Sequence, residues 1–188
     1  MMRLVLAVAL LLSLSQIIHA DHNVTVDNTS NLIVYQGSWI TAVFPNYDYG
    51  GSQQLVDLGS TPDAGGSTAT FKFTGTSFIS PRSLGSQSFS GVAIYFMAPE
   101  WPYTVNTVLT LDSDPPVVVS MTSLNTLPIG SVGPNVVSQV LWGRTGLSNT
   151  EHTLVASLAA GARYIVVDAL MYVLESVLFR DGLTHIIT

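Results

Sequence analysis

The segment 67–75, STATFKFTG, alternates apolar and polar side chains without a break. Ala69, Phe71 and Phe73 occupy one set of positions, and threonines with one lysine occupy the other. A period of two in β-branched and aromatic residues predicts a strand with one buried face. Because two phenylalanine rings on that face need cover from a second layer, the segment predicts a β-sandwich.

Other segments carry the same strand signature, and clusters of turn formers separate them. They are 31–44 (two short strands or one bent strand), 92–97, 105–112, 117–121, 136–142, 152–158 and 164–172. The strands at 105–112 and 117–121 flank a turn and predict a hairpin. Those at 152–158 and 164–172 predict a second strand pair. We therefore predict an all-β fold, an antiparallel two-sheet jelly-roll sandwich of about eight or nine strands over residues 21–172.

The C-terminal region admits a helical alternative over 162–179, since its second half is rich in alanine, leucine and methionine. The β-branched run at 165–167 favours a strand in the first half. For residues 173–188 we expect a C-terminal tail with a short helix or no regular structure.

The segment 76–91 interrupts the strand pattern with a serine-rich run. The letters FTG at 73–75 are echoed by FSG at 89–91, and joining 75 directly to 92 gives an uninterrupted FTGVAIYF. Long surface insertions cost little loop-closure entropy. We interpret 76–91 as an inserted loop or as a retained intron.

The N-terminus predicts a secretory signal peptide over residues 1–20. Arg3 supplies an early positive charge, an apolar run covers 4–14, and a more polar SQIIHA ends in the small residue Ala20. The run is too short to span a bilayer comfortably, which makes a retained membrane anchor the weaker alternative. We expect a mature chain that begins at Asp21 and is secreted, outside the cell or at its surface.

Composition excludes several classes of partner and site. The chain has no cysteine, which excludes a disulfide scaffold, a thiol nucleophile and cysteine metal sites. Six basic and twelve acidic side chains, without a basic cluster, disfavour nucleic acid and anionic membranes as partners. Sequons at Asn23 and Asn28 follow the predicted cleavage point and predict N-glycosylation.

No cluster of residues predicts a metal or cofactor site. His152 is the only histidine in the body of the chain, whereas a zinc site needs three or four convergent ligands. Oxygen ligands for a structural calcium ion occur near predicted turns, where turn formation explains them equally well. They are Asp57, Asp63, Asp112 and Asp114. We expect no cofactor and leave a structural calcium ion as the open alternative.

Several segments together resemble a known family. They are YQGSW at 35–39, GGSTATFKFTG at 65–75, VAIYF at 92–96, LDSDPP at 111–116, VLWGRTGL at 140–147, HTLVASL at 152–158 and YIVVDALMY at 164–172. They resemble the small galactose-binding-like jelly-roll ectodomains that mushroom-forming fungi encode in many copies. The resemblance implies a jelly roll, a secreted or cell-surface address, and carbohydrate binding through loops at one end. A Ser/Thr-rich linker and a membrane helix often follow such domains. Neither is found here, and we expect a free secreted domain or a truncated chain.

Two predicted loops carry the residue types that bind sugars. One offers Trp101 and Tyr103 with Glu100, and the other offers Tyr47 and Tyr49. Exposed rings stack on the apolar face of a pyranose while polar groups orient it. If both loops lie at one end of the sandwich, they form a shallow platform. Alternatively Trp101, flanked by prolines, packs into that end as a plug.

These observations predict a non-catalytic, carbohydrate-binding module of the fungal cell surface or wall, with a glycan as its partner and no transmembrane segment in the mature chain. Two alternatives remain open. One is a glycoside hydrolase that uses Glu100 as its acid and Asp48 as the second carboxylate. The other is a structural surface protein with no small ligand. A serine hydrolase is not supported, because the GxSxG motif is absent from the sequence.

Overall fold

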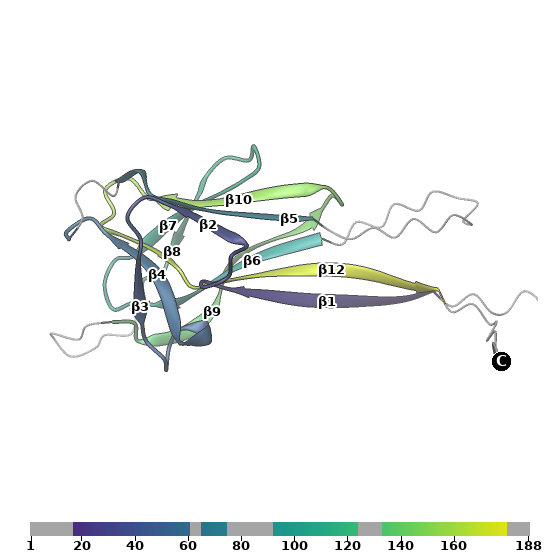
Figure 1. Cartoon of the computed structure of the whole chain (residues 1–188), viewed down its shortest axis with the longest axis horizontal. Helices are drawn as coiled ribbons and strands as arrows, with labels where there is room; N and C mark the ends of the chain where they lie inside the picture. Colours follow the sequence, from purple (N-terminus) through teal and green to yellow (C-terminus); the bar gives the residue numbers. More distant parts are fainter. Residues whose placement is uncertain (1–16, 61–64, 75–91, 124–132, 180–188) are drawn as a thin grey trace, which may run out of the picture.

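The computed structural model of the chain describes residues 17–60, 65–74, 92–123 and 133–179, with side chains described between 23 and 173. These residues form an antiparallel β-sandwich (Figure 1), as the sequence predicts. Its strands are β1 (Ile17–Asp27), β2 (Ile33–Gln36), β3 (Ile40–Val43), β4 (Ser52–Asp57), β5 (Thr68–Thr74), β6 (Val92–Glu100), β7 (Asn106–Leu111), β8 (Val117–Ser120), β9 (Val136–Leu147), β10 (Glu151–Leu158), β11 (Tyr164–Val167) and β12 (Ala169–Phe179). A 3-10 turn, η1 (Tyr49–Gly51), precedes β4.

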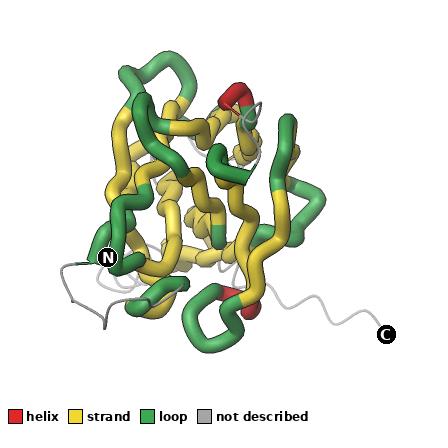
Figure 2. Tube along the Cα trace, turned by 90° about the vertical axis from the view of Figure 1, so that its left-hand side faces the viewer, coloured by secondary structure: helices red, strands yellow, loops and turns green. Residues whose placement is uncertain are grey.

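The strands divide into three sheets. A four-stranded sheet has the order β1-β12-β6-β9, a five-stranded sheet has the order β2-β5-β10-β7-β8, and a smaller sheet has the order β11-β4-β3. In Figure 1 β10, β5 and β2 lie above β6, β12 and β1, and β3 and β4 cross the left-hand end. Figure 2, turned by 90°, shows strands making up the body of the molecule. The smaller sheet is an addition to the two sheets that we predicted.

Strand β5 lies inside the five-stranded sheet, and its alternating pattern is confirmed. Phe71 and Phe73 are buried and their rings stack, with centroids 5.7 Å apart. Tyr172 reaches them from β12 in the opposite sheet, with centroids 5.7 Å and 6.1 Å away. The two phenylalanines are therefore covered by a second layer, as the period-two pattern required.

The hairpin that we predicted is also confirmed. β7 and β8 pair antiparallel, with Thr107 opposite Val119 and Leu109 opposite Val117. Thr107, Leu109 and Leu111 on alternating positions of β7 are all buried. Since the buried Thr107 carries a hydroxyl, it needs a partner, and its Oγ1 donates to the carbonyl oxygen of Val166 at 3.1 Å.

The second predicted strand pair is wrong. β10 lies between β5 and β7 rather than beside the strand that follows it. The segment 164–172 is two strands in two sheets: β11 pairs with β4, and β12 pairs with β1 and β6. The chain passes from one sheet to the other at Asp168, between β11 and β12. A period of two shows which face of a strand is buried and does not identify the neighbouring strand.

Three strands extend beyond their predicted ends. β6 continues to Glu100 and β9 to Leu147, through segments that we expected to be a loop and a turn. The ladder between β6 and β9 has register shifts, and the one between Ala98 and Glu100 spans Pro99, which has no N–H for a regular ladder. β12 continues to Phe179, paired with Ile17 of β1, which corrects the helical or irregular tail expected from residue 173.

Other sequence predictions fall partly or wholly outside the described residues. The signal peptide over 1–20 stays a prediction, since 1–16 are not described and the last four residues begin β1. The inserted loop or retained intron at 76–91 lies outside the described residues, as does Asp63. In the described ranges, no helix has the length and apolar character needed to cross a membrane.

Candidate functional site

The candidate site is built around residues 45–51, which we call the tyrosine loop. The loop begins as a tight turn, in which the amides of Tyr47 and Asp48 donate to the carbonyl oxygen of Phe44 at 2.8 Å and 2.9 Å. The Asp48 side chain returns the contact, because its Oδ2 accepts a 3.1 Å hydrogen bond from the Phe44 amide. These reciprocal bonds fix the turn at the start of the loop.

Glycine closes the loop against β1. Gly50 has φ of 68°, in the left-handed region that favours glycine. A Cβ atom at Gly50 would collide with Oδ1 of Asp27, the last residue of β1. A side chain at this position would therefore push the loop away from the carboxylate.

Two buried carboxyl groups lie under the loop. Asp48 is 8% exposed and Asp168 is fully buried. The backbone amide of Tyr49 donates to Oδ2 of Asp168 at 3.1 Å, which joins the loop to the crossing between β11 and β12. The Oδ1 atoms of Asp48 and Asp168 have no hydrogen-bond partner among the described residues. The loop is thus held on two carboxyl groups that each keep one oxygen unused.

These carboxyl groups hold protons more tightly than ordinary aspartates. Burial, followed by the charge of Asp168, raises the pKa of Asp48 to about 7. Burial also raises the pKa of Asp168 to about 6, although the nearby Ser138 hydroxyl and, to a smaller extent, the Tyr49 amide lower it. Tyr35 lies in the same region: its pKa is raised by burial and then by the charges of Asp27 and Asp168. The charged groups that shift these three pKa values are all carboxylates, and no basic side chain is among them.

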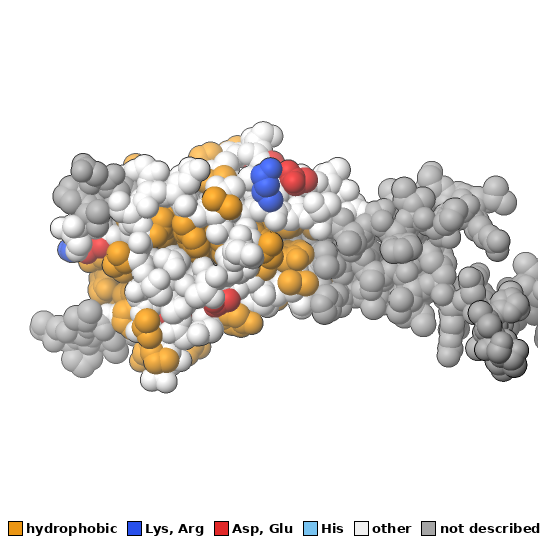
Figure 3. All heavy atoms as spheres, viewed as in Figure 1, with side chains coloured by type: hydrophobic (Ala, Val, Ile, Leu, Met, Phe, Trp, Pro, Cys, Tyr) orange, Lys and Arg blue, Asp and Glu red, His pale blue; other side chains and the backbone are white. Residues whose placement is uncertain are grey.

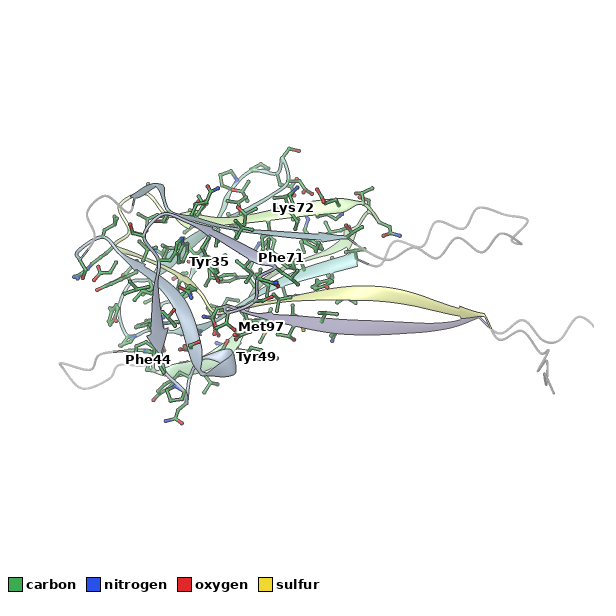
Figure 4. All side chains as sticks on the ribbon, viewed as in Figure 1. Tyr35, Phe44, Tyr49, Phe71, Lys72 and Met97 are labelled. Carbon is green, nitrogen blue, oxygen red and sulfur yellow. The ribbon has the colours of Figure 1, made fainter. Side chains whose placement is uncertain are left out.

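The loop presents two tyrosine rings to solvent. Tyr47 is 36% exposed and Tyr49 is 41% exposed. Figure 4 shows Phe44 and Tyr49 in the lower part of the body of the molecule. The tyrosines of this predicted loop are therefore free to stack on a ligand.

Glu100 comes close to the same loop through β9. The amide of Ser138 on β9 donates to the carbonyl oxygen of Tyr47 at 2.7 Å. The side chain of its neighbour Gln139 donates from Nε2 to Oε1 of Glu100 at 3.1 Å. The two predicted loops therefore lie at the same end of the sandwich, as a combined site requires.

Trp101 does not take part in an exposed platform. Its side chain is 3% exposed and its ring meets Phe44 edge to face, with centroids 5.5 Å apart. The backbone on both sides is fixed, because the Trp101 amide donates to Met121 and the Trp101 carbonyl oxygen accepts from Ser123, each at 2.7 Å. Of our two alternatives for Trp101, the structure shows the plug.

Tyr103 extends that plug instead of the tyrosine loop. Its half-buried ring packs against Trp101 and Tyr164, with centroids 5.5 Å and 5.7 Å away. The guanidinium of Arg163 lies over the Tyr164 ring, 4.9 Å from its centroid. The sequence-predicted set is thus divided, with Tyr47, Tyr49 and Glu100 beside β9 and the other two aromatic residues in a packed column.

The acidic residues that we considered for calcium make other contacts. Asp57 accepts from Nε of Arg163 at 2.7 Å and from the Gly59 amide at 2.8 Å. Arg163, through its hydrogen bond, lowers the pKa of Asp57 to about 2. Asp112 and Asp114 pair with His152 and Arg144. Over the described ranges, no group of three or more His, Cys, Asp or Glu side chains is arranged to hold a metal ion.

The two sequons have different surroundings. Asn23 is exposed on β1. Asn28 is only 1% exposed, and its Oδ1 accepts from the Ser52 hydroxyl at 3.3 Å. The folded structure leaves no room for a glycan on Asn28.

Sequence reasoning missed Asp168, although one signal was available. Asp168 is the only charged residue in the apolar segment 164–174, YIVVDALMYVL. A lone carboxyl group in a buried strand is expensive unless something requires it. Its partner, the Tyr49 amide, lies 119 residues away and could not be identified from the sequence.

Comparisons with known proteins concern the fold. No family model matches the sequence, and no curated protein matches it. A xanthan lyase from Paenibacillus has a similar structure, with a TM-score of 0.50 and 16% sequence identity. The match covers 81% of this chain and 13% of the lyase. An exo-β-1,3-galactanase from Phanerochaete chrysosporium, solved with β-1,3-galactotriose, has a TM-score of 0.48 and 14% sequence identity. The match covers 80% of this chain and 29% of the galactanase. A GH26-CBM35 β-(1,4)-mannanase from Podospora anserina has a TM-score of 0.46 and 13% sequence identity. The match covers 82% of this chain and 28% of the mannanase. The chain therefore spans less than a third of each of these proteins.

Proposed function

We propose that the protein is a secreted, non-catalytic carbohydrate-binding module of the fungal cell surface or wall, with a galactose-binding-like jelly-roll fold. The observation that carries this proposal is the tyrosine loop, which exposes Tyr47 and Tyr49 and is bonded through the Tyr47 carbonyl oxygen to β9, the strand whose Gln139 donates to Glu100. Rings that stack on a pyranose and polar groups that bond to its hydroxyls are the two requirements of a sugar site.

Rigidity supports the same proposal. The loop is anchored by Asp48 at its start and by Asp168 at Tyr49, so that little conformational entropy is lost when a ligand orders the rings. The face shown in Figure 3 carries few charged side chains among uncharged polar and apolar ones. Such a surface suits a neutral glycan better than a charged polymer. The similarity to the xanthan lyase supports the sandwich fold, and the choice of ligand rests on the loop.

The hydrolase alternative has less support. A glycosidase needs a second carboxyl group facing its acid. Glu100 accepts from the amide of Gln139, while the charges that act on Asp48 come from Asp168 and Asp27. The raised pKa of Asp48 is thus explained by its burial and by these two nearby carboxylates. The Glu100–Asp48 pair stays a hypothesis. Release of reducing ends from wall polysaccharide, abolished by Glu100→Gln, would replace the binding proposal by this one.

A glycan array tests the proposed function directly. The mature domain should bind at least one class of neutral glycan, and Tyr47→Ala with Tyr49→Ala should weaken that binding by about tenfold or more through loss of stacking. Because both rings are exposed, the melting temperature of these variants should stay close to that of the wild type. Val118→Ala, which shortens an exposed side chain on β8, is the matched control and should bind normally.

The array also separates the third alternative. A structural surface protein with no small ligand predicts no glycan bound above background by a folded wild-type domain. Binding that survives loss of both tyrosines would leave a carbohydrate-binding protein whose site is not the tyrosine loop.

A further inference from the structure

A polar groove opens beside the turn of the β7–β8 hairpin, away from the tyrosine loop. It encloses about 570 Å³ between Asp112 and Asp114 of the turn and the segment 143–148 that ends β9. Pockets for small ligands measure about 300–1,000 Å³, so that one or two sugar rings fit the space. No tryptophan, tyrosine or phenylalanine is among its described lining residues.

One wall of the groove is held by an ion pair between a buried histidine and a partly exposed aspartate. Nδ1 of His152 lies 2.7 Å from Oδ2 of Asp112, and Nε2 lies 2.7 Å from the carbonyl oxygen of Ser148. Both of these oxygens only accept hydrogen bonds, so both ring nitrogens carry protons and His152 is an imidazolium ion. Asp112 also accepts from the Thr153 amide at 2.7 Å and has φ of 51°. The turn is therefore tied to β10 in one conformation.

The second ion pair in the groove is open to solvent. Nη2 of Arg144 lies 3.3 Å from Oδ2 of Asp114, and the two side chains are 56% and 48% exposed. A long, exposed pair of this kind exchanges readily with water. It offers a charged donor and a charged acceptor next to each other, and two adjacent sugar hydroxyls can each donate and accept.

The backbone at this wall favours a small ligand over a peptide. Segment 143–147 is the end of β9, which among the described strands pairs with β6 alone and so forms an edge of the four-stranded sheet. Free edges can add a strand from another chain. Here the ladder with β6 is shifted between Val92 and Ile94, and Gly146 has φ of 70°. Such irregularities disrupt strand addition but leave backbone groups able to bond to hydroxyls.

We propose that this groove is a second saccharide site, in which Asp114 and Arg144 bind adjacent hydroxyls of a neutral sugar without aromatic stacking. The proposal rests on the proposed function for its ligand class and concerns a separate place on the molecule. Ser138, which contacts the tyrosine loop, and Leu147, which lines the groove, are nine residues apart on β9. At about 3.3 Å per residue the two sites are roughly 30 Å apart along the strand. A protein with two such sites bridges two glycan chains.

Nuclear magnetic resonance titration isolates the groove. The probes are galactose, glucose, mannose and N-acetylglucosamine, added to the Tyr47→Ala/Tyr49→Ala variant so that the tyrosine loop does not contribute. At least one probe should shift the backbone amides of Gly143 and Gly146 saturably, with a millimolar dissociation constant as expected without stacking. Adding Asp114→Asn or Arg144→Ala to this background should weaken the response by about tenfold. Val118→Ala in the same background should leave it unchanged.

Each outcome bears on one proposal. If the amide signals of Gly143 and Gly146 do not shift while the wild type binds the same sugars at the tyrosine loop, the groove proposal is overturned. The proposed function then still stands. Shifts that persist with Asp114→Asn and Arg144→Ala also overturn the groove chemistry. Since both side chains are exposed, dispersed spectra should confirm that these variants fold. If the wild type binds no sugar at the groove and none at the tyrosine loop, both proposals are overturned.

Bridging gives an independent readout. The wild type should make solutions of a branched, soluble galactan or β-glucan turbid, because two sites on one molecule cross-link the polymer. Variants that lack either the two tyrosines or the Asp114–Arg144 pair should still bind oligosaccharides and should not raise the turbidity. Equal turbidity from the groove variant and the wild type contradicts a bridging role.

Discussion

The amide of Tyr49 donates a 3.1 Å hydrogen bond to the carboxyl group of Asp168, across 119 residues of sequence. The donor lies in the tyrosine loop, and the acceptor lies where the chain crosses from the β11 sheet to the β12 sheet. One buried bond therefore ties the shape of the exposed loop to the point at which two sheets meet. Because the acceptor is ionisable, we expect the loop to respond to pH.

Stability should decrease as pH rises from about 4 to about 7. Asp48 and Asp168 have folded-state pKa values of about 7 and about 6, both above the usual 3.8. The folded protein thus holds more protons than the unfolded chain in this range, and its free energy of unfolding falls with pH. Urea unfolding at several pH values measures the slope. Asp48→Asn and Asp168→Asn should each flatten it, and a slope unaffected by both would contradict the assignment.

Below pH 4 the trend should reverse. The hydrogen bond from Arg163 holds the pKa of Asp57 at about 2, so the stability that this pair contributes is present above 3.8 and is lost as pH falls toward 2. Asp57→Asn serves as a control for the preceding prediction. It should change the pH dependence of the unfolding free energy below pH 4 and leave the slope between pH 4 and 7 in place. Because the pair is partly exposed, its effect should shrink in high salt.

Trp101→Ala should destabilise the domain far more than it affects ligand binding. Removing a buried tryptophan costs about 3–5 kcal/mol of unfolding free energy through lost contacts and an internal cavity. Phe44, which packs edge to face on Trp101, loses its partner in the same change. Tyr47→Ala, an exposed position, should cost less than about 0.5 kcal/mol. Chemical denaturation of the two variants measures this contrast, and near-equal losses would mean that Trp101 is not a plug.

The His152–Asp112 pair should stabilise the fold mainly below neutral pH. Burial lowers the pKa of His152, but its hydrogen bonds to Asp112 and Ser148 outweigh this effect and raise it above 6.5. The contribution is therefore complete below 6.5 and is lost as pH rises through the raised value. His152→Gln should be destabilised most in acid and should converge toward the wild type in alkali. A histidine titration followed by carbon-bound proton shifts checks the pKa directly, and a value below 6.5 would contradict the imidazolium assignment.

Expression through a secretory pathway should add one N-linked glycan, at Asn23. The exposed Asn23 accommodates a glycan, whereas the Asn28 side chain is buried against Ser52. Asn23→Gln should abolish the mobility shift that an N-glycosidase causes, and Asn28→Gln should leave that shift and lower stability instead. A glycopeptide at Asn28 in folded, secreted protein would contradict this expectation.

Much of the local structure could be predicted from residue patterns. The alternation of Phe71 and Phe73 with polar neighbours gave a strand with the correct buried face, and the β7–β8 hairpin followed from its turn. Strand ends were less predictable. Pro99 and Gly143 suggested loops, yet β6 and β9 continue past them, because shifts in the ladder absorb residues that a regular ladder would exclude.

The candidate site was only partly predictable for a related reason. Tyr47, Tyr49 and Glu100 were identified by type and by their place in predicted loops, and the structure brings them together beside β9. The same reasoning could not tell whether Trp101 points outward or inward. That choice depends on Phe44 and Tyr103, which come from other parts of the chain.

The sequence by itself determined which segments are extended and which of their faces avoid water, because side chains of a strand alternate with a period of two whatever lies beside it. Only the tertiary structure decided that β10 lies between β5 and β7, that 164–172 divides between two sheets at Asp168, and that Tyr49 bonds to that residue. Strand neighbours and buried polar partners are chosen by packing across the whole molecule, which no local pattern contains.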